Sequence, residues 1–329
     1  MASKSLIACV VAATLGSLVS GIANAATDQI TCGNPVSEES VAACTRLIAH
    51  ASLSGTDRFM AYYNRGWAYR RSGNNSQALA DFDAAESRDR RYAKLYMSRA
   101  LTNHDLGRLE AALEDLDRYV SLAPEDWRGY FERANLLREF QRYNGALKDL
   151  ERASKLNRYA KEIGPAQVLT LIELGRLGSA WAEASRILAA RKSDPAGRYV
   201  RAVISFRRGD LSAAIADLDV AIAGAPLFPA AYSLKAQILE VRSDIAAAQQ
   251  NYEMALRPGG IALDSRTAQA RAKYKLAEHA QSAWSTAAAD SRNGSTDSGS
   301  AKRFATGSSG QCRRFIPAAA VTISVECGD

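Results

Sequence analysis

The sequence predicts an all-α fold in which helical hairpins of one length stack side by side as a solenoid. Two observations lead to this prediction. The spacing of Tyr62, Gly66, Ala78 and Phe82 returns every thirty-four residues, from residue 59 to residue 262, without insertion or deletion. Small residues also recur where two helices must approach closely, with large residues three or four positions away on the same face. One such hairpin cannot enclose its own apolar stripe, so stacked neighbours must form the core.

Six repeats follow from this period: 59–92, 93–126, 127–160, 161–194, 195–228 and 229–262. The fourth repeat is the weakest copy, because Gly164 occupies its first pattern position. Gly164 and Pro165 predict a shortened first helix in that repeat, and Gly175 and Gly178 predict a loose turn after it. We therefore expect the array to bend or narrow there.

The pattern resembles the tetratricopeptide repeat, a helix-turn-helix unit with an aromatic, Gly, Tyr pattern in its first helix and Ala-x3-Phe in its second. The resemblance covers all six repeats in one register. It implies a right-handed α-α superhelix of about six helical hairpins with N- and C-terminal capping helices. The sequence departs from the pattern at Arg or Lys in place of Leu, at Arg in place of Pro in repeats one and three, and in the degenerate fourth repeat.

Residues 1–25 are expected to be a signal peptide cleaved after Ala25. Lys4 gives a short positive region, residues 6–19 are mainly apolar, and Ala23 and Ala25 form a small-x-small site. An uncleaved membrane anchor is the alternative, although polar residues and glycines dilute the apolar run. Leu6–Cys9 also looks like a lipoprotein acylation box, but too few apolar residues precede Cys9. The leader predicts a periplasmic or secreted protein of a bacterial envelope, without stable membrane insertion after cleavage.

Cleavage would leave four cysteines, an even number in an exported protein, and this predicts disulfides. The four are Cys32, Cys44, Cys312 and Cys327. Three connectivities are possible, and local pairing (32 with 44, 312 with 327) is the simplest, because the two pairs lie at opposite ends of a solenoid. No second ligand pair lies at zinc spacing and the chain has three histidines, so we expect no metal site.

The segments outside the array have distinct expected roles. Residues 26–58 form an N-terminal cap that includes a half-repeat helix at 37–51. Residues 263–285 form a C-terminal capping helix, which covers the edge of the last repeat. Residues 286–311, rich in Ser and Gly, predict a disordered linker. Residues 312–329 form a short tail bounded by cysteines, whose β-type alternation at 321–325 fits either a docked hairpin or a detached tag.

The chain has 42 Lys and Arg against 35 Asp and Glu, a net charge of +7 that becomes +6 without the leader, which contains Lys4 and no acidic residue. This excess permits attraction to acidic partners. The basic residues alternate with acidic ones and do not form a stripe, which favours a solvated surface over nucleic-acid binding.

In tetratricopeptide arrays the first helix of each repeat lines an inner concave wall that binds extended peptides or helices. The resemblance therefore implies a partner-binding groove. Its residues would be Tyr63, Trp67, Arg70, Arg71, Lys94, Met97, Leu101, Arg128, Phe131, Asn135, Arg138, Tyr199 and Phe206. Aromatic and Arg side chains serve as interface anchors, and the basic residues would suit an acidic segment or a terminal carboxylate. The alternative is that some apolar members pack against neighbouring helices.

One subclass of the family binds the carboxyl ends of chaperones through Lys and Asn at set places of the first three repeats. The corresponding places here hold Tyr63, Trp67, Ser98, Arg128 and Glu132. Only Arg128 would serve, so this ligand is not expected.

A second constellation pairs basic with acidic residues inside repeats. Four arginines each precede an aspartate by sixteen residues: Arg65 and Asp81, Arg99 and Asp115, Arg133 and Asp149, Arg201 and Asp217. We interpret these as structural ion pairs between the two helices of a repeat, because a half-buried Arg is costly without a partner. The alternative is a row of ligand-reading arginines.

Catalysis fits poorly, since no nucleophile elbow, phosphate loop or paired-carboxylate setting emerges, and neither a catalytic residue nor a cofactor is expected. His104, on the groove, is interpreted as a surface residue. The sequence thus predicts an exported, non-enzymatic scaffold that binds a protein or peptide partner. The alternative is an envelope accessory factor that binds glycan or polymer through the same aromatic groove.

Overall fold

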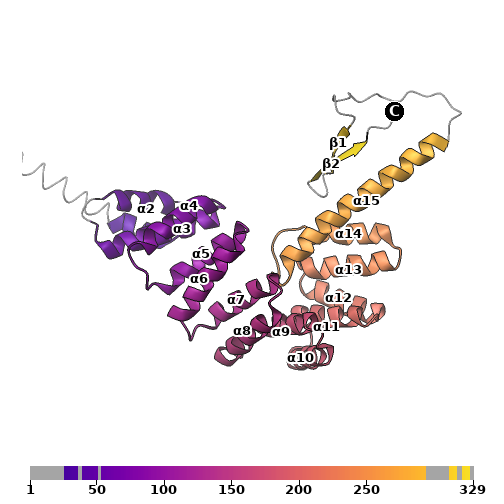
Figure 1. The fold of residues 1–329 in the computed structure, drawn as a ribbon, viewed down its shortest axis with the longest axis horizontal. Helices are drawn as coiled ribbons and strands as arrows, with labels where there is room; N and C mark the ends of the chain where they lie inside the picture. Colours follow the sequence, from indigo (N-terminus) through magenta and orange to yellow (C-terminus); the bar gives the residue numbers. More distant parts are fainter. Residues whose placement is uncertain (1–25, 36–38, 51–52, 294–310, 317–320, 327–329) are drawn as a thin grey trace, which may run out of the picture. The chain divides into compact units, whose positions relative to one another are not determined.

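The computed structural model describes residues 26–35, 39–50, 53–293, 311–316 and 321–326 (Figure 1). The expected signal peptide and its cleavage site, Cys327, and residues 294–310 of the expected linker lie outside the described residues. The chain divides into two compact parts, Met1–Arg158 and Tyr159–Asp329. We call them the N-terminal and C-terminal modules and describe each by itself.

The N-terminal module is a stack of helical hairpins behind a cap. Residues 26–33 are helical, and the next helix, α2, spans Ser40–Ala49. Three hairpins follow: α3 (Gly55–Arg71) with α4 (Asn75–Glu86), α5 (Ala93–Asp105) with α6 (Leu109–Leu122), and α7 (Trp127–Glu139) with α8 (Tyr143–Leu156). Each hairpin corresponds to one of the first three repeats.

The C-terminal module repeats this arrangement and ends in a long helix. Its hairpins are α9 (Ile163–Glu173) with α10 (Leu177–Ala190), α11 (Pro195–Arg207) with α12 (Leu211–Gly224), and α13 (Pro229–Val241) with α14 (Ile245–Ala255). Helix α15 (Ser265–Asn293) covers α13 and α14, against which Ala268, Ala272 and Leu276 are buried. Strands β1 (Gln311–Ile316) and β2 (Val321–Glu326) pair antiparallel, with Cys312 opposite Val325.

Small residues inside each hairpin allow the two helices to meet. The alanine at one position of every second helix (Ala78 and its equivalents 112, 146, 180, 214 and 248) is fully buried. Opposite it in the first repeat, a Cβ added to Gly66 would lie 2.9 Å from the ring of Phe82. The predicted pairing of small with large residues is therefore present, and it places the core between and beneath the paired helices.

The turn between the two helices of a hairpin has one conformation throughout the array. The same repeat position has positive φ in all six hairpins: Gly73, Gly107, Gln141, Gly175, Gly209 and Ser243. A residue in the left-handed conformation ends a helix by turning the chain back, so that the next N–H groups bond to the last carbonyls of the helix. Glycine adopts this conformation without a Cβ penalty. Repeats three and six form the turn with Gln and Ser, which are strained there.

Two expectations about the C-terminal segment are wrong. Residues 286–293 were expected to be disordered, but α15 continues through them to Asn293, because Ala287–Ala289 are strong helix formers. Gln311 was expected to belong to the same linker, but it begins β1. The described residues of the tail thus form two paired antiparallel strands, and the described chain is not helical throughout.

In the fourth repeat, α9 has 11 residues where α11 has 13, and Pro165 lies in its first turn, as expected. The division between the modules falls immediately before this repeat, at Arg158 and Tyr159. The bend itself remains a prediction. In the described part of the chain, no helix combines the length and the apolar character that a membrane crossing requires.

Candidate functional site

The first helices of the N-terminal module share a row of partly exposed side chains. Three repeat positions recur on α3, α5 and α7, and their residues are all half-buried. We call them the first-helix face: Tyr63, Trp67, Arg70, Met97, Leu101, His104, Phe131, Asn135 and Arg138. The thirty-four-residue period places equivalent side chains next to one another on neighbouring helices. The structure therefore brings together the predicted groove residues of repeats one to three.

Aromatic residues at the start of this face are held by contacts across the seam between repeats. The Tyr63 hydroxyl lies 3.3 Å from Ser98 Oγ on α5, and its ring centroid is 5.1 Å from that of Tyr92. Burial raises the pKa of Tyr63. The Arg71 guanidinium lies 5.4 Å from the centroid of Trp67. Tyr63 thus contributes to packing as well as to the face, whereas Trp67 and Arg71 form a more accessible pair.

Polar and charged groups at the far edge of the face are paired between neighbouring repeats. Arg70 Nη2 donates to Asp105 at 3.0 Å, and His104 Nε2 lies 2.8 Å from a carboxylate oxygen of Glu139. These pairs fix the edge of the face and partly neutralise it. By contrast, Arg71, Lys94 and Arg128 are exposed.

A small cavity opens on the first-helix face between α5, α6 and α7. Its volume is about 30 Å³, enough for one or two groups the size of a water molecule. Ala100, Ala112, Leu116 and Leu136 form an apolar floor, and Leu101, His104, Glu132 and Asn135 form a mostly polar rim. An apolar pit with a few polar groups around it suits the tip of one short aliphatic side chain.

The two helical layers of the N-terminal module carry opposite charge. The first helices α3, α5 and α7 contain nine Lys and Arg against four Asp and Glu, and the second helices α4, α6 and α8 contain four against nine. Some of these basic residues form ion pairs with acidic residues of the second helices. The exposed basic residues on the first-helix side remain available to an acidic ligand.

All four predicted ion pairs within repeats are present. The distances are 2.7 Å for Arg65 and Asp81, 2.8 Å for Arg99 and Asp115, 2.7 Å for Arg133 and Asp149, and 2.6 Å for Arg201 and Asp217. The four aspartates are buried. Since these guanidiniums are used inside the protein, they do not form a row of ligand-reading arginines.

The same positions also join each repeat to the one before it, which sequence reasoning missed. Arg99 donates to Asp83 at 2.8 Å and to Glu86 at 2.6 Å, and Arg133 donates to Asp117 at 2.8 Å. In the sixth repeat Lys235 donates to Asp219 at 2.7 Å. The sequence did contain an indication of these contacts, because each of these three aspartates lies sixteen residues before the basic residue that it binds. One side chain therefore fastens a first helix to two second helices.

Comparison with known proteins identifies the repeat. A sequence profile described as tetratricopeptide repeat matches residues 63–127 and 166–229. The chain therefore contains tetratricopeptide repeats. Serine/threonine-protein phosphatase 5 of Homo sapiens, and likewise that of Rattus norvegicus, is 40% identical over 65 residues, which are 20% of this chain and 13% of the phosphatase. The chain thus matches only a small part of these relatives.

Solved structures share the tetratricopeptide fold over a larger part of the chain. A tetratricopeptide repeat protein from Parabacteroides merdae has a TM-score of 0.64 and 18% identity, covering 75% of this chain and 95% of that one. PilW, described as a type IV pilus biogenesis factor, has a TM-score of 0.51 and 18% identity, covering 60% of this chain and 92% of that one. At these identities the likeness concerns the fold alone.

One predicted groove residue, Tyr199, is wrong for this tetratricopeptide array. Its side chain belongs to the core, with a relative exposure of 6% and its ring centroid 5.1 Å from that of Phe228. Its hydroxyl lies 3.4 Å from Asp264, which immediately precedes α15. The segment leading to α15 therefore covers a position that is open in the first repeats. Phe206 is half-buried and packs against the same core cluster.

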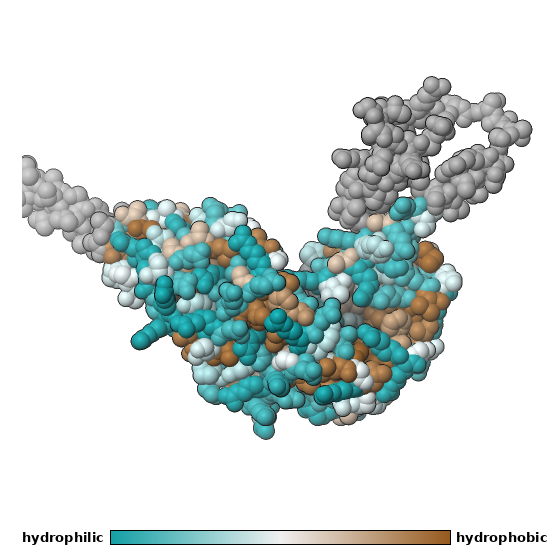
Figure 2. Space-filling model, viewed as in Figure 1, coloured by the Kyte–Doolittle hydropathy of each residue, from teal (hydrophilic) through white to brown (hydrophobic). Residues whose placement is uncertain are grey.

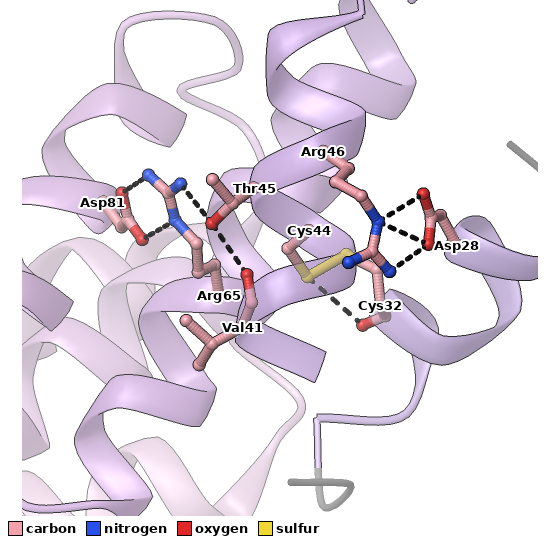
Figure 3. Close-up of a disulfide and its surroundings, with 8 residues drawn as sticks. All are labelled: Asp28, Cys32, Val41, Cys44, Thr45, Arg46, Arg65 and Asp81. Carbon is pink, nitrogen blue, oxygen red and sulfur yellow. Dashed lines mark hydrogen bonds and ion pairs between the residues drawn. A yellow bond between two sulfur atoms is a disulfide. The ribbon is translucent and has the colours of Figure 1, made fainter. Parts of the chain in front are cut away.

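The N-terminal cap of the array contains a disulfide between Cys32 and Cys44 (Figure 3). Both residues are buried, and Arg46 Nε donates to Asp28 at 3.0 Å beside them. This hydrogen bond lowers the pKa of Asp28 against the opposing effect of burial. Arg65 Nη1 donates to Thr45 Oγ1 at 3.0 Å and so links the cap to the first repeat. The second pairing, Cys312 with Cys327, stays a prediction.

The described residues contain no group of three or more His, Cys, Asp or Glu that could hold a metal ion. On the first-helix face, Tyr63, Arg70 and His104 are engaged in the contacts described above. What the arrangement offers chemically is a mixed apolar and basic surface for binding.

Proposed function

We propose that the chain is an interaction scaffold whose first-helix face binds an extended, acidic segment of a partner protein. The observation that carries this proposal is the coincidence of the small apolar cavity, the half-buried Trp67 and Phe131, and exposed basic residues on one side of the N-terminal module. The tetratricopeptide fold supports a role in protein interaction, since its first helices present such a face in register.

Binding would use both kinds of side chain on the face. Met97, Leu101 and Phe131 keep part of their apolar surface in water, and a bound segment would cover it. The cavity would take one short aliphatic side chain, while the Asn135 amide at its rim can donate to and accept from a peptide backbone. Carboxylates of the ligand would meet Arg71, Lys94 and Arg128 in charge-assisted hydrogen bonds.

A glycan ligand would depend on open aromatic platforms. Tyr199 is buried and provides none, and the ring of Trp67 already carries Arg71. These observations favour a protein ligand over a glycan.

We also propose that the protein works outside the cytoplasm of a bacterial-type cell. The expected leader at residues 1–25 supports export. The disulfide of the cap supports an oxidising compartment, because such bonds are rare where thiols are kept reduced.

Selection from a random peptide library tests the ligand. We expect the enriched peptides to be acidic and to carry a short aliphatic residue, and Trp67→Ala and Lys94→Glu each to weaken their binding at least about tenfold. Affinity should also fall as salt is raised. Lys148→Glu, on the exposed side of α8, is the matched control and should bind normally.

Two results would contradict the proposal. One is enrichment of peptides without acidic residues, or of peptides that bind Trp67→Ala as well as the parent chain. The other is retention of purified cell-wall polymer, lost in Trp67→Ala, with no peptide enriched at all, which would favour the glycan alternative.

A further inference from the structure

The outward sides of the second helices differ sharply between the two modules. On α4, α6 and α8 of the N-terminal module, fourteen residues are exposed and nine of them are charged. On α10, α12 and α14 of the C-terminal module, seventeen are exposed and three are charged. We call the exposed side of α10, α12 and α14 the outer face.

The outer face is apolar as well as poor in charge. Trp181, Val220 and Ile245 are exposed on it to 37%, 38% and 44%. Figure 2 shows hydrophobic residues interrupting the hydrophilic surface in the region of α10 to α13. Among the described residues, the second helices of the N-terminal module carry no large hydrophobic side chain exposed to this extent. Isolated exposed hydrophobic residues are ordinary, but a layer of three helices with only three exposed charges and several exposed apolar side chains is typical of an interaction surface.

Two of the three charges on this face already have partners inside the chain. Arg186 donates to Glu183 at 2.8 Å, and Asp219 accepts from Lys235 at 2.7 Å. The face therefore offers little to a strongly acidic or basic partner. Its charges are few, and one nearby cation, Arg208, lies 4.6 Å from the ring centroid of Trp181. Little like-charge repulsion therefore opposes contact between two copies of the same surface.

Between the large residues, the outer face carries small ones. Ala182, Ala189, Ala216 and Ala223 are all exposed. They leave room for a facing helix to approach closely, and the larger Val220 side chain could fit between them. The face is thus shaped for packing against helices and not for enclosing a small ligand.

We propose that the outer face pairs with the outer face of a second copy of this chain. The three helices have 14, 14 and 11 residues. At about 1.5 Å per residue and about 10 Å between neighbours, they present on the order of 500 Å² per copy. Two such faces bury about 1,000 Å², the lower limit for a specific interface. The result is a two-fold symmetric, concentration-dependent dimer.

Sedimentation equilibrium of the purified chain between about 1 and 100 µM tests this pairing. We expect the mean mass to rise toward twice that of one chain. Ala216→Glu places a charge at the centre of α12 and should weaken dimerisation at least about tenfold. Lys148→Glu is the matched control, because residue 148 is exposed at the same repeat position in the N-terminal module, and it should dimerise like the parent.

Mixing two variants with opposite charges at residue 216 distinguishes a loss of dimerisation from a loss of folding. Ala216→Lys should also be monomeric alone, and an equimolar mixture of Ala216→Glu and Ala216→Lys should recover the dimer, because each charge then faces its opposite. A parent chain that stays monomeric, or a dimer that Ala216→Glu leaves intact, overturns the proposal. So does a mixture that stays monomeric, or a monomer that binds phosphatidylglycerol vesicles through Val220.

Discussion

Arg99 and Asp115 form a two-pronged ion pair between the helices of the second repeat, with Nε and Nη2 of the arginine donating to the carboxylate. Burial opposes the positive charge, but the bonds to Asp115 and Glu86 outweigh it and raise the pKa of Arg99. The same guanidinium reaches Asp83 in the first repeat. This side chain therefore joins one hairpin internally and also joins it to its neighbour.

Arg99→Ala should lower the free energy of unfolding by about 3–5 kcal/mol, because it removes the cation that pairs with the buried carboxylate of Asp115. Urea denaturation measures this loss. Affinity for an acidic peptide should stay the same, since Arg99 is not part of the first-helix face. The paired change Arg99→Met with Asp115→Leu should recover most of the stability. Unchanged stability with reduced peptide affinity would instead make Arg99 a ligand-binding residue.

Acid should destabilise the C-terminal module through Asp217. Burial opposes ionisation of this carboxyl, but hydrogen bonds from Arg201 and Arg198 outweigh burial and lower its pKa. A lowered folded-state pKa contributes stability that is fully present above the unfolded pKa of about 3.9 and is lost as pH falls below it. Melting temperatures measured from neutral pH to about pH 2 should therefore drop steeply below about pH 4. Asp217→Asn should be less stable at neutral pH and show a shallower drop, and an unchanged slope would contradict this account.

Gln141→Gly should stabilise the protein by about 1 kcal/mol, because Gln141 adopts φ 58 in a turn where four other repeats use glycine. Thermal and urea unfolding measure the change. The reverse substitution at the equivalent position, Gly107→Gln, should cost a similar amount. If both variants match the parent, the left-handed turn carries no strain.

Loss of the cap disulfide should destabilise the N-terminal end. Replacing Cys32 and Cys44 by Ser opens a loop with a sequence separation of 12, which costs up to about 3 kcal/mol in the chain-entropy model. Hydrogen exchange should speed up in α2 and the start of α3, while α11 to α14 keep the parent rates. Equal exchange across the whole chain in parent and variant would show that the bond does not hold the cap.

Local sequence was enough to predict the hairpins, because their constraints act within one repeat. The buried alanine at Ala78 and its equivalents, the close approach at Gly66, and the pairing of Arg99 with Asp115 all join residues fewer than thirty-four positions apart in a fixed register. The same period also placed the first-helix face, since equivalent residues of stacked helices must lie side by side. The contact of Arg99 with Asp83 could also have been predicted, because Asp83 lies sixteen residues before Arg99, as Asp115 lies sixteen residues after it.

Only the tertiary structure revealed contacts between residues that the thirty-four-residue period does not relate to one another. Tyr199 occupies a groove position in sequence, yet it is buried because the segment before α15 returns over it from sixty-five residues away. The charge-poor outer face of α10, α12 and α14 became visible once each exposed position was known, since composition averages exposed and buried residues together. The period determined which helices pair with one another. Exposure, which depends on the whole folded chain, determined which of their surfaces remain for partners.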